Sequence, residues 1–503
     1  MKSIIMNAML SALAYAAGIV LPLALLVAAY RLLFHPLARY PGPFPAKLTS
    51  AYTAFYAWRL CSHISAYKSF ETYDIYNNPK VTKGRAYQGS RMGTERPNIF
   101  NAADRDLHRQ KRRIIAPTIS ERAMRSFESE MSKEIDVFLV NLLQLSRNNE
   151  VVDMTPLCDR LGMDVVGRLA FGFELKTQSE ATYRHIAAGI KARSAINSVY
   201  MSWPDLRVLD RLITFLRPRS YRSDLENLYR SLRTMIGARM AIPRDAKHDF
   251  YAQVSDKLEP QDLWAEAIMI VGAGGSTTAT PISAIFFYLS RYPTAYERLA
   301  SEIRSGFLSG REISQGPRLN ACTYLRAVID EGLRLSTGTI STWRNQDAAS
   351  IAAGEELVID GHIIPPGTEV AINAYSFMRN ADYFPDPFAF RPERWLAEGV
   401  AEESDAQREH RATMRRAFVP FSLGSRSCAG QPMAYLELNL AVARAMWYFD
   451  FEKAPGEAGK LGEVPGKPLE FKLEDATIVG HHGPNLVLHP RGDLWKELLD
   501  KET

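Results

Sequence analysis

Apolar residues follow two different periodicities along this chain. From about residue 50 onward they recur mostly at spacings of three and four, the pattern of helices that bury one face. The segments 121–145 and 224–240 show this pattern clearly. Strand-like stretches are few, and the segments 355–375 and 476–490 each read as two strands interrupted by glycine or proline. The pattern predicts a mainly α domain with small β-sheets late in the chain.

The N-terminal segment breaks from this periodicity. No charged residue occurs between Ser3 and Tyr30, and residues 9–30 are almost wholly apolar. About 20 helical residues suffice to cross a bilayer, and Pro22 would kink such a helix without forbidding it. A cleaved signal peptide is the alternative, but its apolar core usually spans only about 7–15 residues and ends at a small-x-small site. We therefore expect a membrane anchor over residues 1–33.

Charges on either side of the apolar run predict its orientation. Only Lys2 precedes the run, whereas Arg31, Arg39 and Lys47 follow it. The positive-inside rule then places the rest of the chain in the cytosol. The next stretch, "FHPLARYPGPFP", holds four prolines and a glycine, which preclude a helix and favour a stiff, extended segment. We interpret residues 34–50 as a hinge before the catalytic domain, with a plain linker as the alternative.

Composition and charge narrow the class of protein. The 503 residues are 46% hydrophobic and 23% charged, as in an ordinary folded protein of one large or a few smaller domains. A net charge of +5 is too weak to indicate nucleic-acid binding. Four scattered cysteines form no C-x-x-C pair, which argues against a disulfide framework or a cysteine zinc site and fits a reducing compartment. They are Cys61, Cys158, Cys322 and Cys428.

One cysteine, Cys428, lies in the tight loop "FSLGSRSCAG" directly before an apolar, helix-like run. A helix N-terminus stabilises an anionic sulfur through its unpaired N–H groups and partial positive charge. Gly424 and Gly430 permit tight turns and the close approach of a flat ligand, and Arg426 can pair with a carboxylate on that ligand. These features suggest an iron porphyrin ligated by cysteine, with an inert core cysteine as the alternative.

The spacing in this loop adds a resemblance to a known family. The segment fits F-x-x-G-x-R-x-C-x-G without a gap, and so resembles the haem-thiolate loop of the cytochrome P-450 family. Its five fixed positions are Phe421, Gly424, Arg426, Cys428 and Gly430. The resemblance covers about residues 34–490. The linker "FHPLARYPGP" and the segment "GSRSCAGQPMAYLEL" are similar to those of membrane-bound fungal members of secondary metabolism. It implies the cytochrome P-450 fold over residues 51–490, one preceding transmembrane helix, and a polar C-terminal tail over residues 491–503.

Two further motifs occur in the family's order. "EGLRL" resembles the E-x-x-R motif, carried by Glu331 and Arg334, and "FRPERW" resembles the loop whose arginine is Arg394. A glutamate and an arginine three residues apart are common on helices, so the first motif is weak by itself. The resemblance implies that these three side chains form a buried structural triad rather than a catalytic one.

The segment "AGGSTT", residues 273–278, resembles the oxygen-binding groove of the family's long central helix. The family usually has an acid followed by threonine there, whereas this chain has Ser276 followed by Thr277. Serine holds a water but is far too weak an acid to supply protons. The resemblance implies that Thr277, with Thr278 as a substitute, steadies oxygen, and that Ser276 and Thr277 hold a water chain to a more distant acid or to solvent. The alternative is that both hydroxyls bond back to helix carbonyls.

Three glycines at positions 272, 274 and 275 precede these hydroxyls. Glycine within a helix costs about 1 kcal/mol against alanine, which favours a local distortion that admits oxygen and water. The alternative is a close helix–helix contact that needs small residues.

The resemblance also implies the ligands of the cofactor. "HRQKRR" occupies the place of the W-x-x-x-R helix, with His108 replacing the tryptophan and Arg112 matching the arginine. Arg112, Arg426 and Arg344, in "STWRN", would bind the propionates of haem b (iron protoporphyrin IX), and Cys428 would be its proximal ligand.

The same helix carries a basic stripe. Arg105, Arg109 and Arg113 recur every four residues and therefore share one helical face, with Lys111 to one side. The family places this helix where an acidic reductase docks, which predicts a docking surface. A solvated basic face is the alternative.

The resemblance implies a haem-thiolate monooxygenase that inserts one oxygen atom from O2 into an apolar small molecule. Electrons would come from NADPH through NADPH-cytochrome reductase, with a cytochrome b-type protein as a further donor. The enzyme would be a single-pass protein of the endoplasmic reticulum membrane with its catalytic domain facing the cytosol. Ser276 keeps open a second class, a haem-thiolate isomerase or dehydratase that needs no O2. A haem-binding sensor or carrier is the third.

Overall fold

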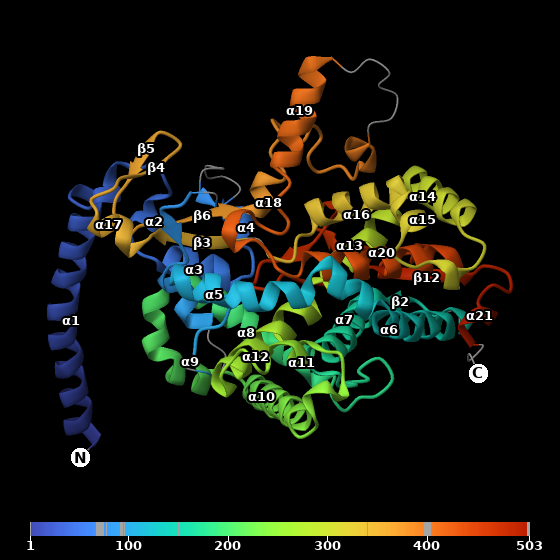
Figure 1. Ribbon diagram of the computed structural model, residues 1–503. Coiled ribbons are helices and arrows are strands. Elements are labelled where there is room, and N and C mark those ends of the chain that lie inside the picture. The colour runs from blue at the N-terminus through green and yellow to red at the C-terminus, as the bar shows by residue number, and fades with distance from the viewer. Residues whose placement is uncertain are drawn as a thin grey trace.

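Helices make up most of the protein, and short strands gather at its edges (Figure 1). The computed structural model describes residues 2–66, 75–76, 78–90, 94, 96–148, 150–339, 341–396 and 404–499. The helices over these residues are α1 Lys2–Leu33, α2 Phe44–Leu48, α3 Ala51–Trp58, α4 Ser62–Ala66, α5 Arg105–Ile115, α6 Glu121–Arg147, α7 Met154–Phe171, α8 His185–Ser202, α9 Asp210–Leu216, α10 Arg219–Met240, α11 Phe250–Val254, α12 Pro260–Thr277, α13 Ala279–Leu289, α14 Pro293–Gly306, α15 Pro317–Asn320, α16 Thr323–Leu335, α17 Ala348–Ala352, α18 Ala374–Phe377, α19 Asp405–Arg416, α20 Gln431–Tyr448 and α21 Lys496–Leu499.

The strands are short and pair antiparallel. They are β1 Val81–Thr82, β2 Val152–Asp153, β3 Ser341–Gln346, β4 Leu357–Ile359, β5 His362–Ile364, β6 Glu369–Asn373, β7 Phe449–Lys453, β8 Glu463–Val464, β9 Lys467–Phe471, β10 Leu473–Glu474, β11 Gly480–His481 and β12 Asn485–Pro490. Two sheets have three strands, in the orders β1-β3-β6 and β2-β12-β7. The mainly α fold with small sheets confirms the prediction from the apolar pattern.

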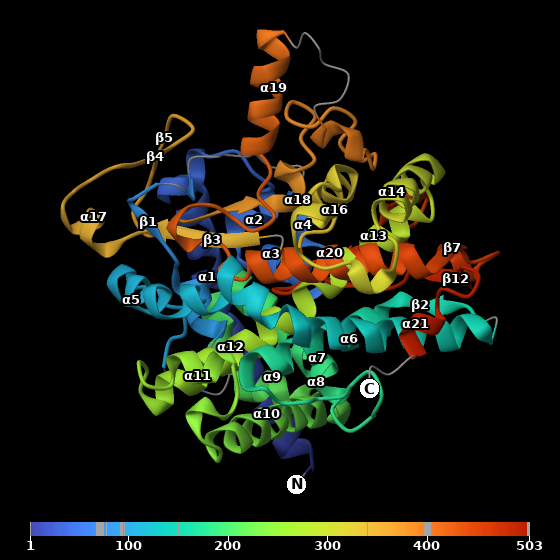
Figure 2. The same cartoon turned by 45° about the vertical axis from the view of Figure 1, so that its right-hand side comes forward.

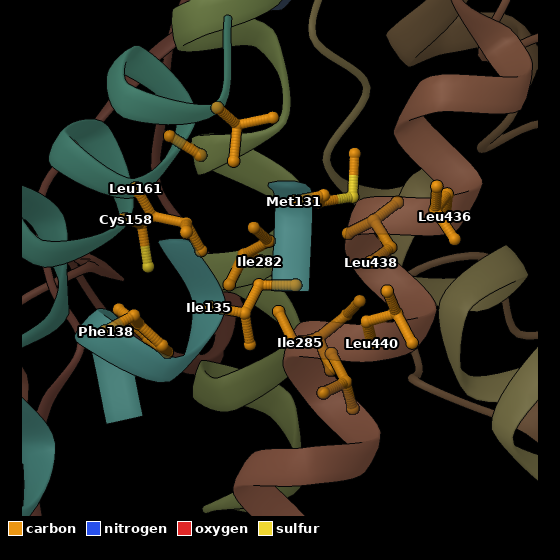
Figure 3. Close-up of a cluster of buried hydrophobic side chains, with 14 of the residues drawn as sticks. Met131, Ile135, Phe138, Cys158, Leu161, Ile282, Ile285, Leu436, Leu438 and Leu440 are labelled. Atoms are coloured by element: carbon orange, nitrogen blue, oxygen red, sulfur yellow. The ribbon is translucent and has the colours of Figure 1, made fainter. Parts of the chain in front are cut away.

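The core forms where long helices meet. In α6 the buried residues recur at helical spacing, among them Phe127, Met131, Ile135 and Phe138, as the sequence predicted. Figure 3 shows side chains of α6, α7, α13 and α20 pointing toward one another in this core. Helix α20 is buried along most of its length, since its sequence is apolar nearly all round. It therefore fixes the position of the loop that precedes it.

The strands in the two segments predicted to be strand pairs belong to more than one sheet. Strands β4 and β5 form a hairpin whose turn residues, Asp360 and Gly361, have φ of 50° and 73°, as a type I′ turn requires. Strand β6 pairs instead with β3, with Ser341 opposite Asn373. Similarly, β11 pairs with β10, whereas β12 pairs with β2 and β7. The apolar pattern located these strands but not their partners.

Helix α1 lies at one side of the molecule, and its N-terminal end points away from the remaining helices (Figure 1). From Gly18 onward most of its side chains are exposed, including Leu21, Leu25 and Leu26. The segment after it is less extended than predicted, because Pro36–Arg39 forms a 3-10 turn and α2 begins at Phe44. Proline fits the first turn of a helix, where its missing N–H is not needed. The expectation that these prolines preclude a helix was therefore wrong.

In the described part of the chain, residues 260–289 are long and apolar enough to cross a membrane, and Gly18–Leu33 of α1 forms a shorter apolar helix. The stretch 260–289 forms α12 and α13, and most of it is buried inside the protein. Figure 2 shows α12 beside α7, α8 and α10, so it is a core helix. The helix is interrupted at Thr278, a turn between α12 and α13.

Candidate active site

The loop 421–430 folds back on itself immediately before α20. Ser422 and Gly424 have φ of 58° and 71°, so the chain turns sharply at both positions. The backbone N–H of Cys428 donates to the carbonyl of Phe421 at 2.8 Å, which closes the loop. Gly430 has an ordinary φ of −83° and caps α20. A positive φ explains the first glycine of the motif, whereas a Cβ at position 430 would make only an ordinary contact with the Cys428 sulfur, at 3.8 Å, so nothing within the chain itself requires the second.

The sulfur of Cys428 lies in a mixed electrostatic environment. Burial raises the pKa of its thiol above the usual value, and the backbone N–H groups of Gly430 and Gln431, with the charges of Arg112 and Lys83, oppose that rise only in part. Donors at the start of a helix stabilise a thiolate in this way. A cation bound on the open side of the sulfur would therefore stabilise its anionic form.

Cys428 lines a cavity of about 330 Å³ between α12 and the start of α20. One wall is the central helix, from Met269 to Pro281, and the opposite wall is the stretch from Val419 to Ala434. Helix α8 contributes a third side, with Ile190, Ser194 and Asn197. Most of the lining is apolar, which suits a flat apolar ligand together with an apolar substrate.

Four of the five described lysine and arginine side chains that line the cavity gather near Cys428, and the fifth, Arg193, lies on α8. Arg112 donates to the carbonyl of Ser427 at 2.5 Å, and Arg344 donates to the Tyr87 hydroxyl at 3.2 Å. Arg426 donates to the Thr82 hydroxyl and the Ala103 carbonyl, both at 3.0 Å. Lys83 donates to the Phe100 carbonyl and lies 4.4 Å from the ring centroid of Tyr87. All four bind neutral groups, so their charges are not neutralised by these contacts.

No aspartate or glutamate lies among the described residues that line this cavity. Burial and the charges of Arg344 and Arg105 lower the pKa of Arg426 to about 10. Burial and the charges of Arg344 and Arg426 hold the pKa of Lys83 well below its usual range. Neighbouring cations thus lower the pKa of both Lys83 and Arg426, and such a cluster of buried or half-buried positive charges calls for an anion between them. The donor set therefore fits a ligand with carboxylates, such as the two propionates of a porphyrin.

His108 lies beside these cations and is buried. Burial, followed by the charges of Arg426 and Lys83, lowers its pKa to about 3. The imidazole is therefore neutral at physiological pH and adds a hydrogen-bonding group rather than a fifth charge.

The glycines of the central helix lie against α7. A Cβ at Gly274 would meet Val166, and one at Gly275 would meet the Met163 sulfur. A close helix–helix contact therefore explains these two glycines. The helix is also interrupted one turn later, at Thr278, so the contact and the distortion both occur.

The hydroxyls of this helix have different surroundings. Thr277 lines the cavity, and its hydroxyl donates to the carbonyl of Ala273 at 2.7 Å. Ser276 is buried outside the cavity lining, and its hydroxyl has no hydrogen-bond partner in the described part of the chain. Thr277 therefore bonds back to the helix, while Ser276 does not.

The three residues Glu331, Arg334 and Arg394 meet in one buried network. The Glu331 carboxylate accepts from Arg334 at 2.8 and 2.9 Å and from Arg394 at 3.0 Å. Arg334 also donates to the carbonyls of Met378 and Pro387, both at 2.7 Å. Burial raises the pKa of Glu331, but the two guanidinium groups outweigh it and hold the pKa below the usual value. This network ties α16 to the chain that follows β6, away from the cavity lining.

The structure thus brings together most of the residues singled out in the sequence. Those that line the cavity are Arg112, Thr277, Arg344, Phe421, Arg426, Cys428 and Gly430. Gly424 and Ser276 lie outside the lining. Sequence reasoning missed Lys83, for which no motif gives a signal, and the buried acid Glu437 of α20. The second had a signal, because it is a lone acid within a helix that is otherwise apolar.

Comparison with known proteins agrees with this geometry. The sequence model described as Cytochrome P-450 matches residues 61–465. The chain is 31% identical to the cytochrome P-450 monooxygenase apf7 of Gibberella fujikuroi over 89% of this chain and 92% of that protein. It is 31% identical to the cytochrome P-450 monooxygenase poxM of Penicillium oxalicum, over 91% of each chain. Identity to atnE of Emericella nidulans, another monooxygenase of that name, is 29% over 96% of this chain and 97% of the other.

Proposed function

The chain belongs to the cytochrome P-450 family, and we propose that it is a membrane-anchored haem-thiolate monooxygenase of fungal secondary metabolism. It inserts one oxygen atom from O2 into an apolar organic substrate, by hydroxylation, epoxidation or a similar step. The observation that carries this proposal is the cavity in which Cys428, at the start of a helix, faces four cations without a carboxylate in the described lining. That donor set fits a thiolate-ligated haem b.

Each residue around the cofactor would have its own part. Cys428 would hold the iron through its thiolate, and Arg112, Arg344 and Arg426, with Lys83, would hold the propionates. Haem with a thiolate ligand supplies the chemistry that activates O2. Phe421 and Gly430 line the face next to the sulfur and leave room for a flat ring. Glu331, Arg334 and Arg394 act at a distance, by holding α16 and the following chain in place.

Thr277 would position oxygen on the other side of the cavity. Its hydroxyl donates its own proton to the Ala273 carbonyl, so its lone pairs remain to accept a hydrogen bond from a water that in turn donates toward oxygen. Ser276 would hold a water behind the helix, since its buried hydroxyl is without a partner. Neither residue is an acid, and a proton must therefore come from elsewhere.

Electrons would come from NADPH through NADPH-cytochrome reductase, with a cytochrome b-type protein as a further donor. Two exposed arginines of α5, Arg109 and Arg113, support a docking surface for an acidic partner. The exposed apolar side chains of α1 support anchoring in the endoplasmic reticulum membrane with the domain in the cytosol.

One observation favours a second class of reaction. The described lining of the cavity holds no carboxylic acid beside Thr277, whereas O2 activation consumes two protons. A haem-thiolate isomerase or dehydratase would not need them.

Isotope labelling separates these two functions. Metabolites that shift the haem absorption spectrum of the purified protein are incubated with it, NADPH, reductase and ¹⁸O2. A monooxygenase gives a product that carries one ¹⁸O atom, with NADPH consumed in step. Product that forms without O2 or NADPH would support the isomerase or dehydratase instead, and haem binding without any product would support a sensor or carrier.

A further inference from the structure

One face of α8 reaches into the haem cavity. Ile190, Arg193, Ser194 and Asn197 all line the cavity, and their spacing of three and four residues places them on one side of the helix. Three of these four side chains are polar, whereas most of the remaining lining is apolar. The polar part of α8 therefore needs an explanation of its own.

The Ser194 hydroxyl is used by the protein itself. It accepts from the backbone N–H of Ile478 at 2.6 Å and donates to the Ile478 carbonyl at 3.2 Å. Thr477, the neighbour of Ile478, donates through its hydroxyl to the Ser194 carbonyl at 3.3 Å. These bonds hold α8 against the turn between β10 and β11, and both residues of that turn also line the cavity. The polar face of α8 is therefore fixed in position.

Asn197, three residues further along α8, has no such role in the fold. The residue is only 5% exposed, and its carboxamide oxygen is buried without a hydrogen-bond partner in the described part of the chain. Buried amide groups without partners are rare and indicate a bound molecule or a functional role. Since Asn197 lines the cavity and its oxygen is buried, the N–H₂ group is the end of the side chain that faces the open space.

Arg193 lies one helical turn before this amide, on the same face. The side chain is half-buried, and its charge acts on nearby tyrosines: burial raises the pKa of Tyr221 and of Tyr229, and Arg193 opposes that rise in both. The four cations near Cys428 act instead on His108. Arg193 is therefore electrostatically separate from the cations that fit the propionates.

The charge and the geometry of this pair select a carboxylate. No aspartate or glutamate lies among the described residues of the lining, so a negative charge in this part of the cavity comes with the ligand. Asp210, which acts on the same two tyrosines, lies outside the lining and accepts from the Tyr200 hydroxyl at 2.6 Å. A planar carboxylate matches the parallel N–H groups of a guanidinium and keeps lone pairs for a third donor.

We propose that Arg193 and Asn197 bind a carboxylate of the substrate, and that the substrate is therefore an apolar carboxylic acid. This inference deepens the monooxygenase function proposed above and rests on it. Arg193 donates two parallel N–H bonds to the carboxylate, and the Asn197 N–H₂ group donates a third. A neutral ester accepts hydrogen bonds but brings no charge opposite the guanidinium, so it binds more weakly.

The rest of the cavity suits the body of such a molecule. Apolar side chains from the segment before α5 and from α12 complete the lining, namely Ile99, Phe100, Met269 and Ile270. With its carboxylate held on α8, the substrate turns its apolar part toward Cys428. Oxygen then enters a carbon remote from the carboxylate.

Binding is measured without turnover, from the shift of the haem absorption spectrum of the ferric, full-length holoenzyme. The probes are dodecanoic acid, hydrocinnamic acid and abietic acid, each paired with its methyl ester. At least one acid should bind, and roughly 10- to 100-fold more tightly than its ester, because hydrogen bonds to a charged group are stronger than those to a neutral one.

Variants of α8 show whether this preference comes from the proposed pair. Arg193→Met keeps the apolar stem of the side chain, so it should abolish most of the preference while the ester binds as before. Arg193→Lys should keep part of it, since lysine retains the charge but not the parallel donors. Asn197→Leu should weaken binding of the acid severalfold. Ile190→Ala, on the same face, is the matched control and should weaken acid and ester alike.

Haem content and the ferrous carbon monoxide spectrum should match the parent in all four variants. Acids that bind no more tightly than their esters, a preference that survives Arg193→Met, or the failure of every acid to bind would overturn the carboxylate site and leave the monooxygenase function standing. A bound acid that is converted to product without O2 would instead refute that function and leave the carboxylate site standing.

Discussion

Glu331 accepts hydrogen bonds from two arginines, the indole N–H of Trp395 and the backbone N–H of Arg391, all within 3.0 Å. Removal of its charge would leave Arg334, itself fully buried, without a counter-ion. We predict that Glu331→Gln lowers the free energy of unfolding by about 3–5 kcal/mol, the usual cost of breaking a buried pair. Urea unfolding measures the change, and the fraction of protein that retains haem should fall with it.

A surface pair provides the control for this prediction. Asp386 pairs with Arg391 at 2.7 Å, but both side chains are at least half exposed. Asp386→Asn should therefore cost less than about 1 kcal/mol. If Glu331→Gln and Asp386→Asn lowered the free energy of unfolding equally, the Glu331 network would not be what stabilises the fold.

The sequence was informative about single residues only where a motif constrains them. The loop around Cys428 has five fixed positions, and the structure places four of them on the cavity. Lys83 follows a two-residue strand and belongs to no pattern, so only its place in the fold, beside Arg344 and Arg426, reveals it. Glu437, the one acid of α20, was not predicted as a functional residue, and only the fold shows that it is fully buried.

At the scale of elements, α5 divides its basic residues between two faces. Lys111 points inward and pairs with Asp262 at 3.2 Å and Glu266 at 2.9 Å, both on α12. Arg105 pairs with Asp347 at 3.2 Å and is only partly exposed. Of the predicted stripe, Arg109 and Arg113 are exposed to solvent, and Arg109 also pairs with the exposed Asp106 at 2.6 Å.

We predict that Arg109→Ala combined with Arg113→Ala slows reduction of the haem by the reductase severalfold at low ionic strength. Charge complementarity mainly accelerates association, so added salt should slow the parent enzyme toward the rate of the variant. Stopped-flow reduction under carbon monoxide measures both effects. Arg233→Ala, at an exposed position of α10, should leave the rate unchanged. A double variant that is reduced as fast as the parent at every salt concentration would refute the docking surface.

The long amphipathic helices were predicted well because their periodicity is a local property. Helices α6 and α10 extend only a few residues beyond the segments identified from sequence. Strand partners were not predictable, since β6 finds β3 across more than twenty residues and β12 joins β2 from the first half of the chain. Such pairing depends on the packing of distant helices rather than on the pattern within a strand.

At the scale of the whole molecule, α1 is not the only exposed apolar surface. The patch formed by the 3-10 turn Pro204–Leu209 and α9 exposes Val208 at 88%, Phe215 at 68% and Leu216 at 71%. In Figure 1 this patch lies on the same side of the molecule as α1. Exposed apolar patches of this kind mark a membrane or protein contact.

We predict that deletion of residues 1–33 releases most of the protein from membranes without loss of haem. A minor fraction should remain bound through the α9 patch, and Phe215→Ser with Leu216→Ser in the shortened chain should release it. Sedimentation of membranes, with haem content measured in both fractions, provides the test. A shortened protein that sediments as completely as the intact one would show that α1 is not the main anchor.

The central claim is that Cys428 binds haem through its thiolate, and the carbon monoxide difference spectrum of the ferrous protein tests it most directly. Thiolate donation to the iron shifts this band to long wavelength, and a neutral hydroxyl cannot replace it. Cys428→Ser should therefore lose the red-shifted band, whereas Cys61→Ser, Cys158→Ser and Cys322→Ser should keep it. An unchanged red-shifted band in Cys428→Ser would contradict the claim.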